Sequence, residues 1–288
     1  MMQKLWNTYY LYYKGDADHL LKEVVHTSLQ NIQEQLGKEV RFFFIRYFEN
    51  GYHVRLRLLL SADEVPLFFS VLKDQLSNYE RVHETQVVLK EAQYIPETDR
   101  YGNADTIAYA ESQFYGSSQF ILNNLVQNYL ITTQERYLLA LKTQMAFFKG
   151  MKLSQHDSLQ LCHEFVESWL PVPYSENPDE VEQNRKSLLS AFQQQFDTYK
   201  AALYESLEEF RGSLDTTEDP FLQEFLEVNN KVYENYARSQ LSKNQINEAL
   251  LSFIHMNNNR LGIINAEESY LLFLIMQTIP LIKNYDER

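Results

Sequence analysis

The sequence predicts an α+β protein in which a small antiparallel sheet of the ferredoxin-like β-α-β-β-α-β order is followed by a mostly helical part. Three observations predict it. In residues 1–104, aromatic and β-branched runs alternate with runs whose apolar residues recur at helical spacing. Asn50-Gly51 joins two of the apolar runs, which is typical of a β-hairpin. From residue 105 to residue 288 helical periodicity dominates.

The elements of the first part follow from their composition and their end signals. Asp16 is a helix start signal and Gly37 a stop signal around a run with helical spacing, and Pro66 belongs in the first turn of the next helix. Strands are therefore expected at Trp6–Tyr13, Val40–Glu49, Tyr52–Leu60 and Glu84–Ile95, and helices at Asp16–Leu36 and Ala62–Tyr79.

The second part is expected to be a series of helices. The clearest loops, residues 171–178 and 212–219, are too short to be interdomain linkers. We therefore expect a single domain over residues 1–288, with a sheet-containing part at 1–104 and a helical part at 105–288. The helices are predicted at Asp105–Gln127, Gln134–Lys149, Ser154–Trp169, Asp179–Arg211, Pro220–Arg238, Lys243–Met256 and Ala266–Lys283.

The composition excludes several classes of protein. With 39 acidic and 26 basic residues the net charge is −13, which argues against a broad nucleic-acid-binding surface. The one cysteine, Cys162, excludes an internal disulfide framework and a Cys-rich metal site. No apolar run reaches the roughly 18 residues of a membrane span, and the N-terminal residues lack a signal-peptide pattern. A cytoplasmic protein is therefore expected.

The predicted hairpin brings several cations close together. If its turn is a two-residue loop, Arg46 lies directly opposite Arg55, on the same face as His53 and Arg57. Like charges opposite one another destabilise a sheet. Internal carboxylates, solvent exposure or an anionic ligand would each compensate. Because a ferredoxin-like sheet has its own helices on one face only, the helical part can cover the arginine face and form a crevice.

Two more candidates lie outside the hairpin. Arg100 is in a loop that enters a helix, a common position for functional groups, although Glu97 or Glu111 would alternatively pair with it as a structural clamp. His255 is expected at the end of its helix, where the helix dipole favours an imidazolium; a packed or surface histidine is the alternative. The sequence contains no metal-binding His spacing, Walker loop, dinucleotide-binding motif or nucleophile elbow.

Three segments together resemble the C-terminal domain of lantibiotic dehydratases, the thiopeptide-type bacteriocin biosynthesis domain. They are residues 42–58, with His-Val-Arg-Leu-Arg; residues 94–114, with Tyr-Ile-Pro-Glu-Thr-Asp-Arg-Tyr-Gly-Asn; and residues 253–262, with His-Met-Asn-Asn-Asn-Arg. These landmarks follow the family's order and span nearly the whole chain. Two positions depart from the family pattern: Asn103 replaces a second Gly, and Ser117-Ser118 replaces Asp-Ser.

The resemblance implies a function in bacteriocin biosynthesis. In full-length relatives, one domain attaches glutamate from charged tRNA to Ser or Thr of a precursor peptide, and the C-terminal domain eliminates it to give dehydroalanine or dehydrobutyrine. The resemblance thus implies a stand-alone elimination subunit, a carbon–oxygen lyase without cofactor or metal. Its implied partners are the glutamylated peptide, a separate tRNA-dependent glutamylating subunit and a cyclase, with no direct nucleic-acid contact. A pyridine-forming cycloaddition enzyme and a non-catalytic peptide-binding scaffold are the alternatives.

The resemblance matches Arg57, with Arg55 beside it, Arg100 and His255 to family residues needed for elimination. From their chemistry, our hypothesis is that Arg55 and Arg57 hold the glutamyl carboxylates, Arg100 stabilises developing negative charge and His255 is the general base or acid. The aromatic surplus, 20 Tyr, 18 Phe and 2 Trp, suits a homodimer interface as well as core packing. The expected catalytic residues are Arg57, Arg100 and His255, and the expected substrate-binding residues are Arg46, His53, Arg55, Glu97, Tyr101, Glu111 and Arg260.

Overall fold

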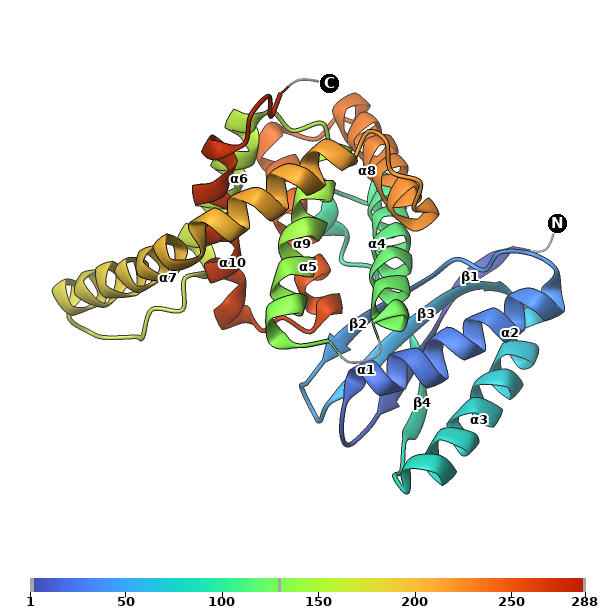
Figure 1. The fold of residues 1–288 in the computed structure, drawn as a ribbon. Coiled ribbons are helices and arrows are strands. Elements are labelled where there is room, and N and C mark those ends of the chain that lie inside the picture. The colour runs from blue at the N-terminus through green and yellow to red at the C-terminus, as the bar shows by residue number, and fades with distance from the viewer. Residues whose placement is uncertain (1–2, 129–130, 287–288) are drawn as a thin grey trace.

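The chain forms a four-stranded antiparallel sheet beside a largely helical part (Figure 1). The computed structural model describes residues 3–128 and 131–286. The strands are β1 (Lys4–Tyr12), β2 (Phe42–Tyr47), β3 (His53–Ser61) and β4 (Val88–Gln93), in the order β2-β3-β1-β4. A β-α-β-β-α-β connection produces this order, so the predicted α+β class with a ferredoxin-like sheet is confirmed.

Two helical runs cover one face of the sheet. The first contains α1 (Ala17–His19), a π-helical segment (Leu20–His26) and α2 (Thr27–Leu36), and the second is α3 (Glu64–His83). The Asp16 side chain accepts a hydrogen bond from the amide of Asp18, and Gly37 ends the first run with a φ of 61°. Both end signals therefore act as predicted.

The second part is a set of packed helices. Among them α4 and α9 both contact β2, and thereby join the helical part to the sheet. The N-terminal end of α7 projects away from the other helices (Figure 1). The helices are α4 (Ile107–Gln127), α5 (Thr133–Gly150), α6 (Gln155–Trp169), α7 (Pro178–Ser213), α8 (Pro220–Arg238), α9 (Lys243–Leu261) and α10 (Asn265–Thr278), with 3-10 turns at Thr98–Tyr101 and Ile279–Leu281.

One apolar core spans both parts. The buried apolar side chains of the described residues form a continuous cluster that includes sheet residues such as Leu56 and helical residues such as Phe253. Within the same residues, no helix is both long and apolar enough to cross a membrane.

The hairpin register differs from the prediction by one residue. Tyr47 pairs with His53, and Arg46 pairs with Val54 rather than with Arg55. A shift of one residue moves a side chain to the opposite face of a sheet. The prediction that two arginines face each other is therefore wrong, and Arg46 lies on the face opposite to Arg55.

The turn explains the shift. Asn50 and Gly51 have the positive φ values expected of them, 60° and 104°. They complete a turn in which the amide of Gly51 donates to the carbonyl of Phe48 at 3.1 Å. The chain thus reverses through residues 48–52 rather than through two residues, which separates the like charges that a two-residue loop would oppose.

Arg46 joins the sheet to the helical part. Its guanidinium donates to Asp18 at 2.6 Å and to the carbonyl of Arg260 at 2.9 Å, and the other oxygen of Asp18 accepts from Arg136 at 2.7 Å. The Asn259 side chain bonds both the amide and the carbonyl of Arg46, at 2.9 and 2.8 Å. These bonds cover the edge of β2, so the charge of Arg46 is compensated by an internal carboxylate.

Asp18→Asn is expected to destabilise the fold by about 3 kcal/mol, because it leaves Arg46 and Arg136 without their buried carboxylate. Burial alone would raise the pKa of Asp18, but the two arginines outweigh it and lower the pKa from 3.8 to about 2. The wild-type carboxylate therefore contributes about 2 kcal/mol that is fully present above about pH 4 and lost as the pH falls through about 2.

Urea unfolding between pH 6 and pH 2, followed by circular dichroism, measures this contribution. The free energy of unfolding should fall less steeply with acid in Asp18→Asn than in the wild type. Asp63→Asn, which changes an exposed carboxylate, is the matched control. The same acid dependence in all three proteins would contradict the assignment.

Candidate active site

A small cavity lies on the sheet face opposite α2 and α3, where α4 and α9 meet it. Its volume is about 40 Å³, room for about three water-sized atoms, which is the size of a carboxylate group. Two hollows of about 670 and 630 Å³ elsewhere in the helical part contain none of the predicted site residues. The cavity is lined by Phe43, Ile45, Arg57, Tyr94, Ile95, Glu97, Tyr101, Phe114, Met256 and Arg260.

Arg57 enters the cavity from β3. Its guanidinium carbon lies 5.1 Å from the centre of the Phe43 ring and 5.2 Å from that of Tyr94. The Nε atom is buried and has no hydrogen-bond partner. Burial lowers the pKa of Arg57 below its ordinary value. Aromatic faces thus replace a carboxylate around this cation.

Arg260 enters from α9 and is fully buried. It donates from Nε to Ser118 Oγ at 2.9 Å and from Nη1 to Ser117 Oγ at 3.3 Å, while Nη2 has no partner. Burial lowers its pKa to about 9, and the charge of Arg57 acts in the same direction. Ser117 and Ser118 thus give Arg260 hydroxyl acceptors without negative charge.

The cavity therefore has more positive than negative charge, because two arginines and one carboxylate, the largely exposed Glu97, line it. No ion pair with a carboxylate involves Arg57 or Arg260 anywhere in residues 3–128 and 131–286. A buried polar group without a partner is costly, and Arg57 Nε and Arg260 Nη2 are buried donors without one. This arrangement suits a carboxylate-bearing ligand that brings the missing negative charge.

Arg100 lies at the rim, in the turn Thr98–Tyr101. Its Nε donates to Ser252 Oγ on α9 at 3.0 Å, and its Nη1 contacts Glu97 at 3.3 Å. Of the two carboxylates considered for a clamp, Glu97 is the one in contact. Because Glu97 is largely exposed, this ion pair is weak and a stronger anion can displace it.

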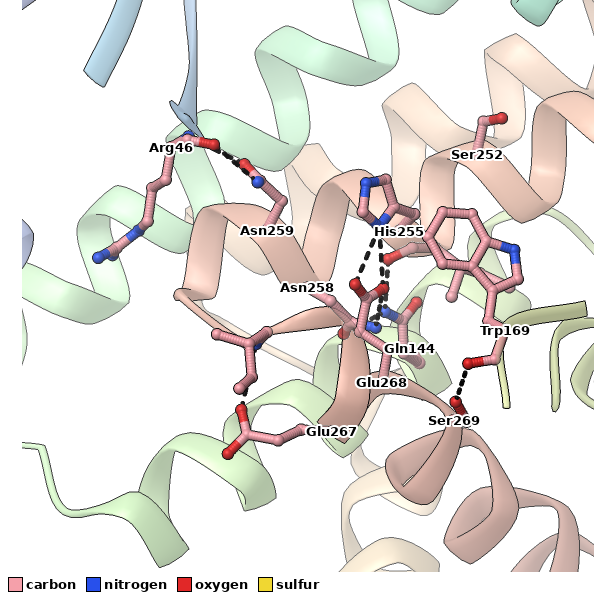
Figure 2. Close-up of polar contacts among 12 residues, drawn as sticks. Arg46, Gln144, Trp169, Ser252, His255, Asn258, Asn259, Glu267, Glu268 and Ser269 are labelled. Carbon is pink, nitrogen blue, oxygen red and sulfur yellow. Dashed lines mark hydrogen bonds and ion pairs between the residues drawn. The ribbon is translucent and has the colours of Figure 1, made fainter. Parts of the chain in front are cut away.

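His255 forms a pair with Glu268 (Figure 2). Its Nδ1 lies 2.9 and 3.1 Å from the two oxygens of the fully buried Glu268, which also accepts from Asn258 at 3.3 Å. The Trp169 ring packs on the imidazole, with centres 4.5 Å apart. The second ring nitrogen points away from the carboxylate (Figure 2). Since Glu268 accepts from Nδ1–H, Nε2 is the nitrogen left for proton transfer.

The helix that carries His255 is longer than predicted. It continues to Leu261, and Gly262 ends it with a φ of 78°. His255 is therefore not at the helix end, and the expected help of the helix dipole is replaced by the Glu268 carboxylate. Ser252, which holds Arg100, lies one turn before His255 on the same helix, so α9 positions both groups.

His53 and Arg55 lie next to the cavity rather than in it. The buried His53 donates from Nδ1 to the carbonyl of Gly51 at 2.8 Å and accepts at Nε2 from Arg55 at 3.1 Å. Arg55 stacks on Tyr47, with its guanidinium carbon 3.5 Å from the ring centre. His53 thus supports Arg55.

The remaining predicted residues divide into two groups. Tyr101 and Glu97 line the cavity. Glu111 instead forms a hydrogen bond with Tyr94, which together with burial raises the pKa of that phenol. Arg46 lies on the other face of the sheet, as described above, because of the shifted register. No group of three His, Cys, Asp or Glu side chains that could hold a metal ion occurs among the described residues.

Two contributors were missed by the sequence prediction. Glu268 is separated from His255 by the end of α9 and the start of α10, and Ser252 is a buried serine of α9 that no motif marks. Glu268 follows Glu267 in the first turn of α10, where acidic residues usually serve the helix dipole. This common role explains Glu268 without any contact, so the sequence provides no reason to expect its contact with His255.

Three solved structures similar to this chain have low sequence identity to it and show the fold alone. The tRNA-dependent lantibiotic dehydratase MibB from Microbispora sp. 107891 is 17% identical with a TM-score of 0.63, over 95% of this chain and 28% of MibB. The pyridine synthase TbtD from thiomuracin biosynthesis is 12% identical with a TM-score of 0.71, over 96% of this chain and 98% of TbtD. TsrL is 13% identical with a TM-score of 0.63, over 95% of this chain and 94% of TsrL.

The family assignment comes from the sequence as a whole. Among curated proteins, none matches the chain significantly. The chain spans less than a third of the length of MibB, which it matches throughout its own length. The model of the family described as lantibiotic biosynthesis dehydratase, C-terminal, matches residues 6–279. This match covers most of the chain and agrees with the fold, and the chain belongs to the lantibiotic dehydratase C-terminal domain family.

Proposed function

We propose that this protein eliminates glutamate from glutamylated Ser or Thr residues of a ribosomal precursor peptide, giving dehydroalanine or dehydrobutyrine. The observation that carries the proposal is the cavity whose two arginines, Arg57 and Arg260, keep buried donors without partners and form no ion pair among the described residues. A glutamyl group supplies a free carboxylate of matching charge. A separate glutamylating subunit would prepare the substrate.

The reaction needs a base and a stabiliser of negative charge. The base removes the α-proton of the esterified residue, the electron pair forms the Cα=Cβ bond, and the Cβ–O bond breaks so that glutamate leaves as a carboxylate. Nε2 of His255 suits the base, since Glu268 orients the ring and stabilises the imidazolium that forms. Arg100, at the rim and bonded to Ser252 one helical turn before His255, suits the stabilisation of the developing charge.

The direct test is mass spectrometry of a chemically glutamylated precursor peptide incubated with the pure protein. We expect loss of glutamate and formation of a dehydro residue. A peptide that keeps its glutamate under conditions where the protein is folded would reject the elimination function.

The second candidate is pyridine-ring formation by cycloaddition on an already dehydrated peptide. Its support is the full-length correspondence with the pyridine synthase TbtD, of which 98% is covered. In this case the same assay would leave glutamylated peptide unchanged, while a peptide with two dehydroalanines would be converted to a ring-containing product.

Ser117→Asp is expected to weaken binding of a glutamylated peptide at least about tenfold, or about 1.4 kcal/mol. Ser117 Oγ is 3.3 Å from Arg260 Nη1, so the new carboxylate can pair with this guanidinium and neutralise it. Fluorescence anisotropy with a labelled peptide measures the affinity. Ser117→Asn, which has the same size without the charge, is the control. Equal affinities of the two variants would contradict anion binding by Arg260.

A further inference from the structure

The face of the sheet that carries Arg57 continues beyond the cavity as three rows of side chains. The register places Phe43, Arg57, Thr8 and Ala92 in the first row, Ile45, Arg55, Tyr10 and Lys90 in the second, and Tyr47, His53, Tyr12 and Val88 in the third. The first row borders the cavity. We call the second and third rows, with Phe48 at the hairpin tip, the aromatic shelf.

The aromatic rings of the shelf are packed together and partly open to solvent. Tyr12 stacks on His53 with centres 4.4 Å apart, and the Tyr47 and His53 ring centres are 5.4 Å apart. Phe48 stacks on Tyr47 and remains 67% exposed. Val88, at the other end of the third row, is 46% exposed. An exposed aromatic surface beside a site is typical of peptide recognition.

The shelf also carries positive charge. Arg55 lies 4.8 Å from the ring centre of Tyr10, and Lys90 lies 4.7 Å from that of Tyr12. Neither cation has an ion pair within the part of the chain that the structure describes. Burial is the largest cause of the lowered pKa of His53, and the charges of Arg55 and Lys90 lower it further. Both cations therefore act on the same part of the shelf. The nearby Glu49 carboxylate accepts a bond from the Tyr47 hydroxyl.

The spacing of the rows matches an extended peptide. Rows along β3 are two residues apart, or about 7 Å, and side chains i, i+2 and i+4 of an extended chain point to the same side. A peptide lying along β3 with its reacting residue at the cavity would therefore place a residue two positions away over the second row. The residue four positions away would lie over the third.

We propose that the aromatic shelf binds the precursor peptide beside the reacting residue, favouring an acidic side chain two positions away and an aromatic one four positions away. The acidic side chain would pair with Lys90 and Arg55, and the aromatic side chain would pack on Tyr12, Tyr47 and Phe48. This inference rests on the proposed function for the identity of the peptide. It assigns a substrate preference that the cavity alone does not provide.

The test uses two fluorescein-labelled peptides whose glutamate is attached through an amide to diaminopropionate, so that it cannot be eliminated. One peptide has Asp at positions −2 and +2 and Phe at −4 and +4, and the other has Ala at these four positions. We expect the wild-type protein to bind the first at least about tenfold more tightly. Because binding is measured without turnover, the result is independent of whether the protein eliminates glutamate.

Variants of the protein test whether the aromatic shelf causes the preference for the first peptide. In Lys90→Glu and in Tyr12→Ala the ratio of the two dissociation constants should fall to about threefold or less. Lys90 is exposed, so its variant tests the shelf even if Tyr12→Ala does not fold. Tyr174→Ala removes an aromatic side chain that is 90% exposed in another region, and the ratio should keep its wild-type value.

Three outcomes would overturn the proposal. Two of them are equal affinity of the wild-type protein for both peptides and a preference that Lys90→Glu leaves intact. The third is a wild-type dimer in sedimentation velocity that Lys90→Glu or Tyr12→Ala converts to a monomer, because the shelf would then be covered by a second copy of the chain.

Discussion

Replacing Arg57 by methionine is expected to lower kcat for glutamate elimination about 10²–10³-fold while making the fold more stable by about 1–3 kcal/mol. Activity falls because the cavity loses a cation that faces the substrate carboxylate. Stability rises because Arg57 has a buried Nε without a partner and no ion pair among the described residues. Methionine has a similar length and can pack against Phe43 and Tyr94 without the cost of a desolvated charge.

Arg46→Met is the matched control, since it makes the same substitution in the neighbouring strand. Arg46 is paired with Asp18 and bonded to the carbonyl of Arg260, so its loss should destabilise the fold by about 3 kcal/mol. Urea unfolding and single-turnover mass spectrometry give the two quantities for each variant. If Arg57→Met behaved like Arg46→Met, losing stability and keeping activity in its folded fraction, Arg57 would be a structural cation instead.

His255→Ala is expected to lower kcat for elimination about 10²–10⁴-fold, because the α-proton loses its base. Added imidazole should restore part of the activity if the side chain transfers a proton, and should have no effect if it only packs against Trp169. The rate of dehydro-residue formation at increasing imidazole concentration measures this. His156→Ala, at an exposed position of α6, is the control and should keep its activity.

Glu268→Gln separates positioning from proton transfer. The amide can still contact Nδ1 of His255, but it carries no charge to stabilise an imidazolium. We expect kcat to fall at least about tenfold with KM little changed, and imidazole to give no rescue because His255 still fills its place. A Glu268→Gln protein with wild-type kcat would show that the carboxylate serves only the packing of α10.

Much of the fold follows from local sequence patterns. Asp16 and Gly37 bound the first helical run where they were predicted to, and the alternation of strand and helix patterns implies the β2-β3-β1-β4 order. Element type depends on periodicity and end signals, which are contained in short windows of sequence. The ends of elements were less accurate, as at α9, where Asn257–Arg260 continue the helix because their side chains bond other elements.

The site was predictable to the extent that its residues lie in recognisable segments. Arg57, Arg100, His255 and Arg260 were expected from the hairpin, the loop, the late helix and the resemblance to the dehydratase family. Their partners Ser252 and Glu268 were not expected, because each is paired with a residue that no local pattern links to it. No local pattern distinguishes a serine that holds an arginine from a serine that faces solvent.

The sequence by itself determined the class of fold, the family and the presence of arginines that a protein of charge −13 keeps on one hairpin. Only the tertiary structure decided which of them face the cavity. A turn of five residues instead of two moved Arg46 to the far face, where Asp18 compensates it, and left Arg57 in a cavity with Arg260, where neither arginine has an ion pair among the described residues. The physical reason is that side chains alternate across a strand, so one residue of register reverses their direction, and register depends on contacts with helices far away in the sequence.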